Sequence, residues 1–140
     1  MGDLLRMGVV EAVEGRRCTV RVGDLVSGPV PWFLRRAGKT VAWTRVSPGE
    51  QGLLVCPEGE IAAGVFLPGA LSTAFDTATT NDVELTTFED GGSVLYDPAA
   101  HRHEVTVPAE GGDARTVAGE SSVSVTAERV RVQAARIELN

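Results

Sequence analysis

The sequence has no apolar run of the roughly 18–20 residues that a membrane-spanning helix needs, and its first residues lack the apolar region of a secretory signal. Its two cysteines, Cys18 and Cys56, are too few for a disulfide scaffold or a four-cysteine zinc site. Aromatic residues make up only 5% of the chain, and a net charge of −6 argues against a chain that wraps nucleic acid as a whole. What is left in 140 residues is one ordinary domain, or a small domain with an extension.

The charge is unevenly distributed along the chain. Residues 1–72 carry eight Lys and Arg against seven Asp and Glu, whereas residues 73–140 carry five against twelve. A polar, Thr-rich stretch at residues 72–81 separates the two halves. The sequence therefore predicts one domain over residues 1–74 and a different unit over residues 75–140.

The first unit shows short, evenly spaced strand patterns. They fall at residues 6–13, 18–22, 41–46, 53–56 and 61–67, and residues 57–60 between the last two are typical of a hairpin turn with Gly59 at its tight position. Five strands in about 70 residues favour a small closed barrel, and the OB fold is a common solution of that kind. Cys18 and Cys56 would fill core positions as small apolar groups, with a disulfide between them as the alternative.

The second unit also has strand patterns, at residues 83–88, 93–96 and 104–107. From Ser122 onward the sequence repeats every seven residues, which stacks Val123 on Val130 and Val125 on Val132. Within each repeat the apolar residues lie two apart, so they share one face of a strand. The alternative for residues 128–139 is an amphipathic helix.

Short strands with small inward-facing residues cannot close a core by themselves, and they leave sheet edges unpaired. The second unit is therefore predicted to need other copies of the chain. Three chains wound around a common axis would form a fibrous β-prism with the valine stripes at its centre. The predicted trimer core consists of Val123, Val125, Val130, Val132, Ile137 and Leu139.

Several short motifs occur in a characteristic order along the chain. They are Pro31-Trp32, Arg35-Arg36-Ala37-Gly38, Trp43, Pro48-Gly49-Glu50-Gln51 and Leu67-Pro68-Gly69, followed by the segments at residues 86–91 and 93–97. In this combination the sequence resembles the phage baseplate assembly protein V family, the central tail spikes of contractile-tailed phages and phage tail-like particles.

The resemblance implies an all-β protein, with an N-terminal OB-fold barrel followed by an intertwined, homotrimeric β-helix. It implies a structural protein of the virion tail baseplate, assembled in the host cytoplasm, that pierces the host outer membrane when the sheath contracts. Its partner would be the tail hub protein, docked on a surface around Trp32, Arg35, Arg36 and Lys39. No enzymatic activity and no small-molecule substrate are expected.

Members of this family commonly end in a narrow tip where a His-x-His motif from three chains holds an iron ion. Here the sequence stops at Asn140, inside the repeat, so the stem is expected to be short or truncated and no tip metal or other cofactor is expected. The only similar motif, His101-Arg102-His103, follows a turn and is interpreted as the solvated end of a hairpin, with a metal site as the alternative.

Other functions have less support from the residues. Arg35, Arg36 and Lys39 beside aromatic residues could contact nucleic acid, but the near-neutral charge of this half supplies little attraction, so no nucleic acid is expected. The alternative function is a monomeric OB-type binding module for an oligonucleotide or oligosaccharide. An enzyme lacks support because neither histidine lies in a nucleophile motif and Glu58 and Glu60 flank a turn, so no catalytic residues are proposed.

Overall fold

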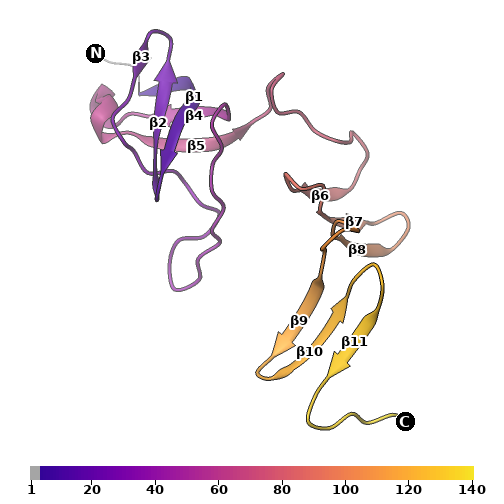
Figure 1. Ribbon diagram of the computed structural model, residues 1–140. Helices are drawn as coiled ribbons and strands as arrows, with labels where there is room; N and C mark the ends of the chain where they lie inside the picture. The colour runs from indigo at the N-terminus through magenta and orange to yellow at the C-terminus, as the bar shows by residue number, and fades with distance from the viewer. Residues whose placement is uncertain (1–3) are drawn as a thin grey trace. The chain divides into compact units, whose positions relative to one another are not determined.

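The computed structural model describes residues 4–140, so the first three residues of the predicted N-terminal domain lie outside the described part. The chain divides into two compact units between Thr77 and Ala78, close to the boundary expected at residue 74. That these units are independent domains stays a prediction. Both are built from strands (Figure 1), and among the described residues no helix is long and apolar enough to cross a membrane.

The first unit is an antiparallel five-stranded sheet with the order β3-β2-β1-β4-β5. Its strands are β1 (Leu5–Glu14), β2 (Arg17–Val22), β3 (Leu25–Val26), β4 (Gln51–Val55) and β5 (Val65–Ala70). The segment after β3 closes the sheet, because Val30 bridges to Cys18 of β2 and Trp32 bridges to Phe66 of β5. The N-terminal unit is therefore a small all-β barrel, consistent with an OB domain.

Two glycines let the barrel close tightly around its core. Gly8 of β1 and Gly52 of β4 lie opposite each other in the sheet. A Cβ atom on Gly52 would lie 2.7 Å from the Phe66 ring, and one on Gly8 would lie 2.5 Å from Cγ1 of Val20. Side chains at these two positions would therefore occupy the space that Phe66 and Val20 fill.

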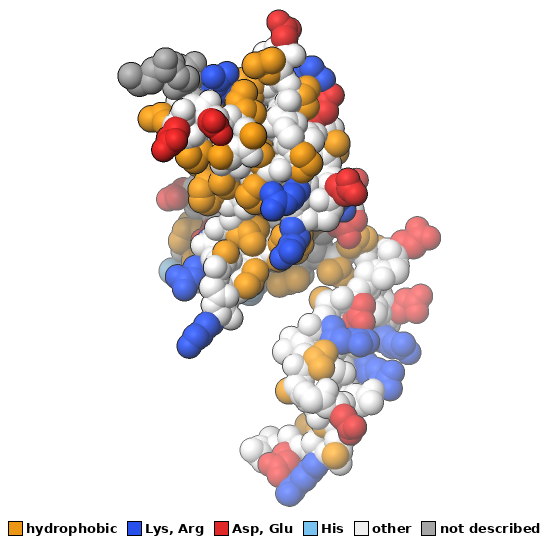
Figure 2. Space-filling model, turned by 90° about the vertical axis from the view of Figure 1, so that its left-hand side faces the viewer, with side chains coloured by type: hydrophobic (Ala, Val, Ile, Leu, Met, Phe, Trp, Pro, Cys, Tyr) orange, Lys and Arg blue, Asp and Glu red, His pale blue; other side chains and the backbone are white. Residues whose placement is uncertain are grey.

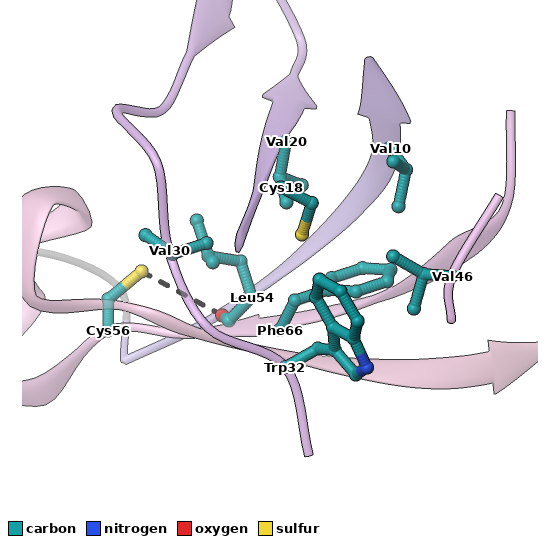
Figure 3. Packing of buried hydrophobic residues seen from close by; sticks show 9 residues of the cluster. All are labelled: Val10, Cys18, Val20, Val30, Trp32, Val46, Leu54, Cys56 and Phe66. Carbon is teal, nitrogen blue, oxygen red and sulfur yellow. Dashed lines mark hydrogen bonds between the residues drawn. The ribbon is translucent and has the colours of Figure 1, made fainter. Parts of the chain in front are cut away.

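The barrel encloses one hydrophobic core of small and medium side chains around the rings of Phe66 and Trp32 (Figure 3). Its buried members are Val10, Cys18, Val20, Val30, Trp32, Val46, Leu54, Cys56 and Phe66. The two cysteines are free thiols in this core, as the apolar interpretation expects. Burial, with a smaller contribution from the negative charge of Glu50, raises the pKa of the Cys18 thiol, so Cys18 stays protonated and unreactive at neutral pH.

Two sequence-based assignments in the barrel are wrong. Residues 41–46 do not form a strand. The strand that completes the set of five is instead the short β3, which was not predicted. The indole N–H of Trp32 donates a hydrogen bond to the carbonyl oxygen of Thr44 at 3.0 Å, which holds this segment as an irregular loop. The turn after β4 is also longer than a tight hairpin, because two short 3-10 turns, Pro57–Gly59 and Ile61–Ala63, precede β5. Ile61 packs against the core there.

The second unit contains two three-stranded antiparallel sheets. One consists of β6 (Glu84–Thr87), β7 (Ser93–Asp97) and β8 (Arg102–Thr106), and the other of β9 (Ala114–Ala118), β10 (Ser121–Val125) and β11 (Val130–Gln133). Strands β6, β7 and β8 confirm the expected segments, whereas β9 was not predicted. The helix considered for residues 128–139 is wrong, since β11 is a strand and residues 134–140 have no regular structure.

The seven-residue repeat correctly predicted that β10 and β11 are strands, but it did not predict how they pair. These strands form an antiparallel hairpin in which Val123 lies opposite Val132, and Val125 lies opposite Val130. The expected stacking of Val123 on Val130 is therefore wrong within one chain. The turn that allows the hairpin is stabilised by Thr126, whose amide donates to the carbonyl oxygen of Arg129 at 2.9 Å.

Candidate interaction surfaces

One face of the second unit is apolar and uncovered. Opposite residues in an antiparallel pair share a face, so Val123, Val125, Val130 and Val132 lie together on one side of the β9–β11 sheet. These four valines are 45%, 46%, 68% and 52% exposed. Four of the six predicted trimer-core residues are thus brought together on one exposed surface, the valine face.

The other two predicted core residues lie beyond the last strand. Ile137 and Leu139 belong to the irregular segment after β11, and they are 54% and 93% exposed. Nothing in one chain places them on the valine face. Their role in a trimer core stays a prediction.

The second unit buries no large apolar side chain. Every buried hydrophobic residue of the described chain lies in the barrel, and in the second unit only Gly92 and Ser124 are buried. An open apolar hollow of about 640 Å³ lies beside the valine face, with Val105, Val107 and Pro108 among its lining residues. Apolar side chains in this unit therefore line a surface instead of a core.

A second surface is formed by the long connection between β3 and β4, which extends away from the barrel strands in Figure 1. From residue 25 to residue 49 the sequence contains no Asp or Glu but four cations, Arg35, Arg36, Lys39 and Arg45. All four are exposed. We call residues 33–45 the cationic loop.

The predicted docking surface is wrong at one residue. Trp32 is only 7% exposed and belongs to the barrel core, so it is not available to a partner. Its ring packs against Trp43, with centroids 5.3 Å apart. Trp43 is 51% exposed and Phe33 is 47% exposed, so these two aromatics, not Trp32, accompany Arg35, Arg36 and Lys39 on the surface.

A third surface, on the outside of the barrel, was not anticipated. The registers of β1, β4 and β5 align Met7 with Leu53 and Leu67, and Leu5 with Val55 and Val65, on the outer side of the sheet. Met7, Leu5 and Leu67 are 51%, 58% and 43% exposed. Figure 2 shows hydrophobic side chains gathered over the barrel. The sequence contained a signal for this outer apolar surface, because residues 4–10 include apolar residues at both odd and even positions and so on both faces of the strand.

The two histidines lie in different parts of the β7–β8 hairpin. His101 lies in the turn before β8 with a left-handed φ of 50°, whereas His103 lies in β8 opposite Tyr96. Among residues 4–140 no group of three or more His, Cys, Asp and Glu side chains is arranged to hold a metal ion. Glu58, one of the two carboxylates considered above, lies in the turn after β4, also with a left-handed φ.

A barrel with a cationic loop, followed by thin sheets with an uncovered apolar face, defines an all-β protein whose N-terminal unit is consistent with an OB domain. Residues 6–71 match the model of the type VI secretion system and phage-baseplate injector OB domain. The chain is also similar to the spike protein of Escherichia phage P2, with 28% identity over 128 residues. The match covers 89% of this chain and 55% of that relative, so the chain spans about half the length of the relative. These findings confirm the resemblance to the phage baseplate assembly protein V family, and residues 6–71 are the part of the chain that is similar to the injector OB domain.

Proposed function

We propose that this chain is a structural tail protein, the homotrimeric central spike of a contractile-tail baseplate. The observation that carries this proposal is the second unit's valine face with no core beneath it. Val123, Val125, Val130 and Val132 are all about half exposed or more. Each buried apolar side chain contributes roughly 1.5–3 kcal/mol, so three copies of this face that meet at an axis would supply the missing core.

The proposed role is mechanical. The OB barrel would attach the spike to the tail hub, and the stem would be driven through the host outer membrane during contraction. The similarity to a spike protein and to the injector OB domain supports this role. As a proposed component of the virion tail, assembled in the host cytoplasm, the chain needs no catalytic residue and no cofactor for this work.

The mass of the protein in solution tests the proposal. Light scattering behind a sizing column should give about 44.1 kDa, three times the chain mass of 14.7 kDa. Val130→Asp should prevent the trimer, because it would bury three like charges near one axis. A mass of 14.7 kDa for the unmodified chain would overturn the proposal.

Gln133→Asp is the matched control for Val130→Asp. It lies in the same strand and changes the net charge by the same amount, but it lies on the opposite face, across from Ser122. It should leave the trimer intact. Equal loss of the trimer in both variants would show that charge in β11, and not burial of the valine face, decides assembly.

A further inference from the structure

We infer that the cationic loop, residues 33–45, is the docking element of the barrel and that it binds an acidic face on the hub protein through Phe33 and Trp43 as apolar anchors. This inference rests on the proposed function, because it names the chemistry of the hub surface that the spike would meet. It replaces the surface expected from the sequence, which included the buried Trp32.

The charge of the loop is not neutralised within the chain. Among the described residues, no ion pair includes Arg35, Arg36 or Lys39. Arg16, Arg17 and Arg129 also form no ion pair, but only the loop combines unpaired cations with a long stretch of chain that contains no acid. The loop itself supplies no carboxylate, since the nearest acidic residues along the chain are Asp24 and Glu50. Three neighbouring cations without partners are an unfavourable arrangement in isolation, and an acidic surface would relieve it.

The loop is held in shape before any partner arrives. The amide of Phe33 donates to the carbonyl oxygen of Phe66 at 2.8 Å, and the amide of Ala42 donates to the carbonyl oxygen of Arg36 at 2.9 Å. At its far end, the Arg45 guanidinium donates to the carbonyl oxygen of Val13 at 3.2 Å. A loop fixed at both ends loses less conformational entropy on binding than a free one, which favours affinity.

The exposed aromatics give the loop the composition of a protein interface. Trp and Arg are the residues most enriched among those that dominate binding energy at protein–protein contacts. Trp43 leans on the buried Trp32, so its exposed side is presented by a rigid support. Nucleic acid is the less favoured partner, because affinity for a phosphate backbone increases with the number of cations that contact it, and the loop supplies only four.

The test compares binding of the purified hub protein of the same tail to three trimers of the full chain. The first is unmodified, and the second carries Arg35→Glu, Arg36→Glu and Lys39→Glu. The third carries Arg16→Glu, Arg17→Glu and Arg129→Glu, three reversals of exposed cations outside the loop. Light scattering first establishes that each variant has the mass of the unmodified protein, which separates failure of docking from failure of the trimer.

We expect the loop variant to bind the hub about 100-fold more weakly and the control variant to bind within about threefold of the unmodified protein. Phe33→Ser alone should also weaken binding, with little change in its salt dependence. Equal binding by all three trimers, or no hub binding by the unmodified trimer, would overturn the inference. So would loop-dependent binding of a 30-base-pair DNA duplex at the same salt concentration, which would assign the loop to nucleic acid.

Discussion

The two units of this chain solve the problem of burial in different ways. The barrel wraps five strands around Phe66 and eight other buried side chains, and its core is complete within one chain. The second unit has six strands but no buried apolar side chain, and its valines remain on the surface. Strand formation therefore does not by itself imply a stable domain, because a sheet that buries no apolar side chain gains little hydrophobic stabilisation.

Hydrogen exchange at one central strand of each unit should show the largest difference between the two units. Strand β1 lies between β2 and β4, and β10 lies between β9 and β11, so both have neighbours on each side. Amides of β1 should exchange only through global unfolding of the barrel, at a rate independent of protein concentration. Amides of β10 should exchange faster, by at least about 100-fold in dilute protein, and should slow as the concentration rises. Slow, concentration-independent exchange in β10 would show that the second unit is stable alone.

Removing a ring from each unit should produce a smaller contrast. Phe66 is 0% exposed, whereas Phe88, in the turn after β6, is 55% exposed. Phe66→Ala should lower the free energy of unfolding of the barrel by about 3–5 kcal/mol. Phe88→Ala removes the same atoms and should cost less than about 0.5 kcal/mol in the unassembled chain. Urea unfolding followed by the tryptophan fluorescence of the barrel measures the first loss, and far-UV circular dichroism, which reports the strands of both units, measures the second. Similar losses would contradict the burial difference.

Much of the barrel could be predicted because its strands follow simple local patterns. Alternation in residues 18–22 defines β2, which forms as expected, and Gly15 with its left-handed φ allows the hairpin before it. Residues 41–46 have equally good β-forming residues, but the tertiary hydrogen bond from Trp32 to Thr44 takes the carbonyl that a ladder would use. Strand β9 was missed because Val117 is its only large apolar residue.

The surfaces were less predictable than the strands. The cluster of cations could be located from the sequence, since the residue types alone identify the charged positions. Which of two nearby tryptophans is buried depends on the bridge between Trp32 and Phe66, a contact that joins distant segments. The pairing of Val123 with Val132 likewise depends on a hairpin turn between them, and a seven-residue repeat does not determine whether neighbouring strands run parallel or antiparallel.

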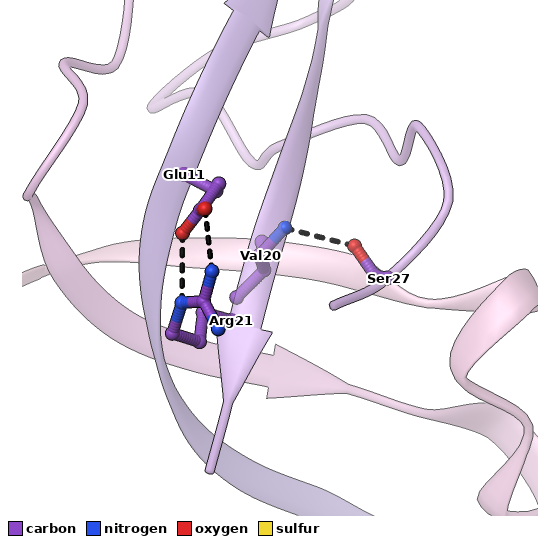
Figure 4. Close-up of polar contacts among 4 residues, drawn as sticks. All are labelled: Glu11, Val20, Arg21 and Ser27. Carbon is purple, nitrogen blue, oxygen red and sulfur yellow. Dashed lines mark hydrogen bonds and ion pairs between the residues drawn. The ribbon is translucent and has the colours of Figure 1, made fainter. Parts of the chain in front are cut away.

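Within the barrel, one buried hydroxyl offers a finer test. The Ser27 hydroxyl accepts a hydrogen bond from the amide of Val20 at 2.9 Å (Figure 4). It also donates to the carbonyl oxygen of Gly28 at 2.8 Å. Ser27→Ala leaves the buried Val20 amide without this partner and should destabilise the barrel by about 1–3 kcal/mol. Ser122→Ala, in the second unit, is the comparison and should have little effect on barrel unfolding. No loss in Ser27→Ala would mean that water replaces the hydroxyl.

The smallest effect is expected at the surface of the barrel, where Glu11 accepts two hydrogen bonds from the guanidinium of Arg21 across β1 and β2 (Figure 4). These bonds lower the pKa of Glu11 below its ordinary value of 4.5. A carboxyl whose pKa is lower in the folded state stabilises the fold above its unfolded pKa and loses that contribution as the pH falls through the folded value. Barrel stability should therefore decrease slightly between about pH 5 and pH 3, and Glu11→Gln should reduce this part of the decrease.

Because the Glu11 and Arg21 side chains are about half exposed, solvent screens the pair. The change in stability should therefore be close to the smallest that thermal unfolding can detect. The carboxyl chemical shift of Glu11 is the sharper measurement, and an ordinary titration midpoint in the unmodified protein, unchanged by Arg21→Gln, would contradict the pairing.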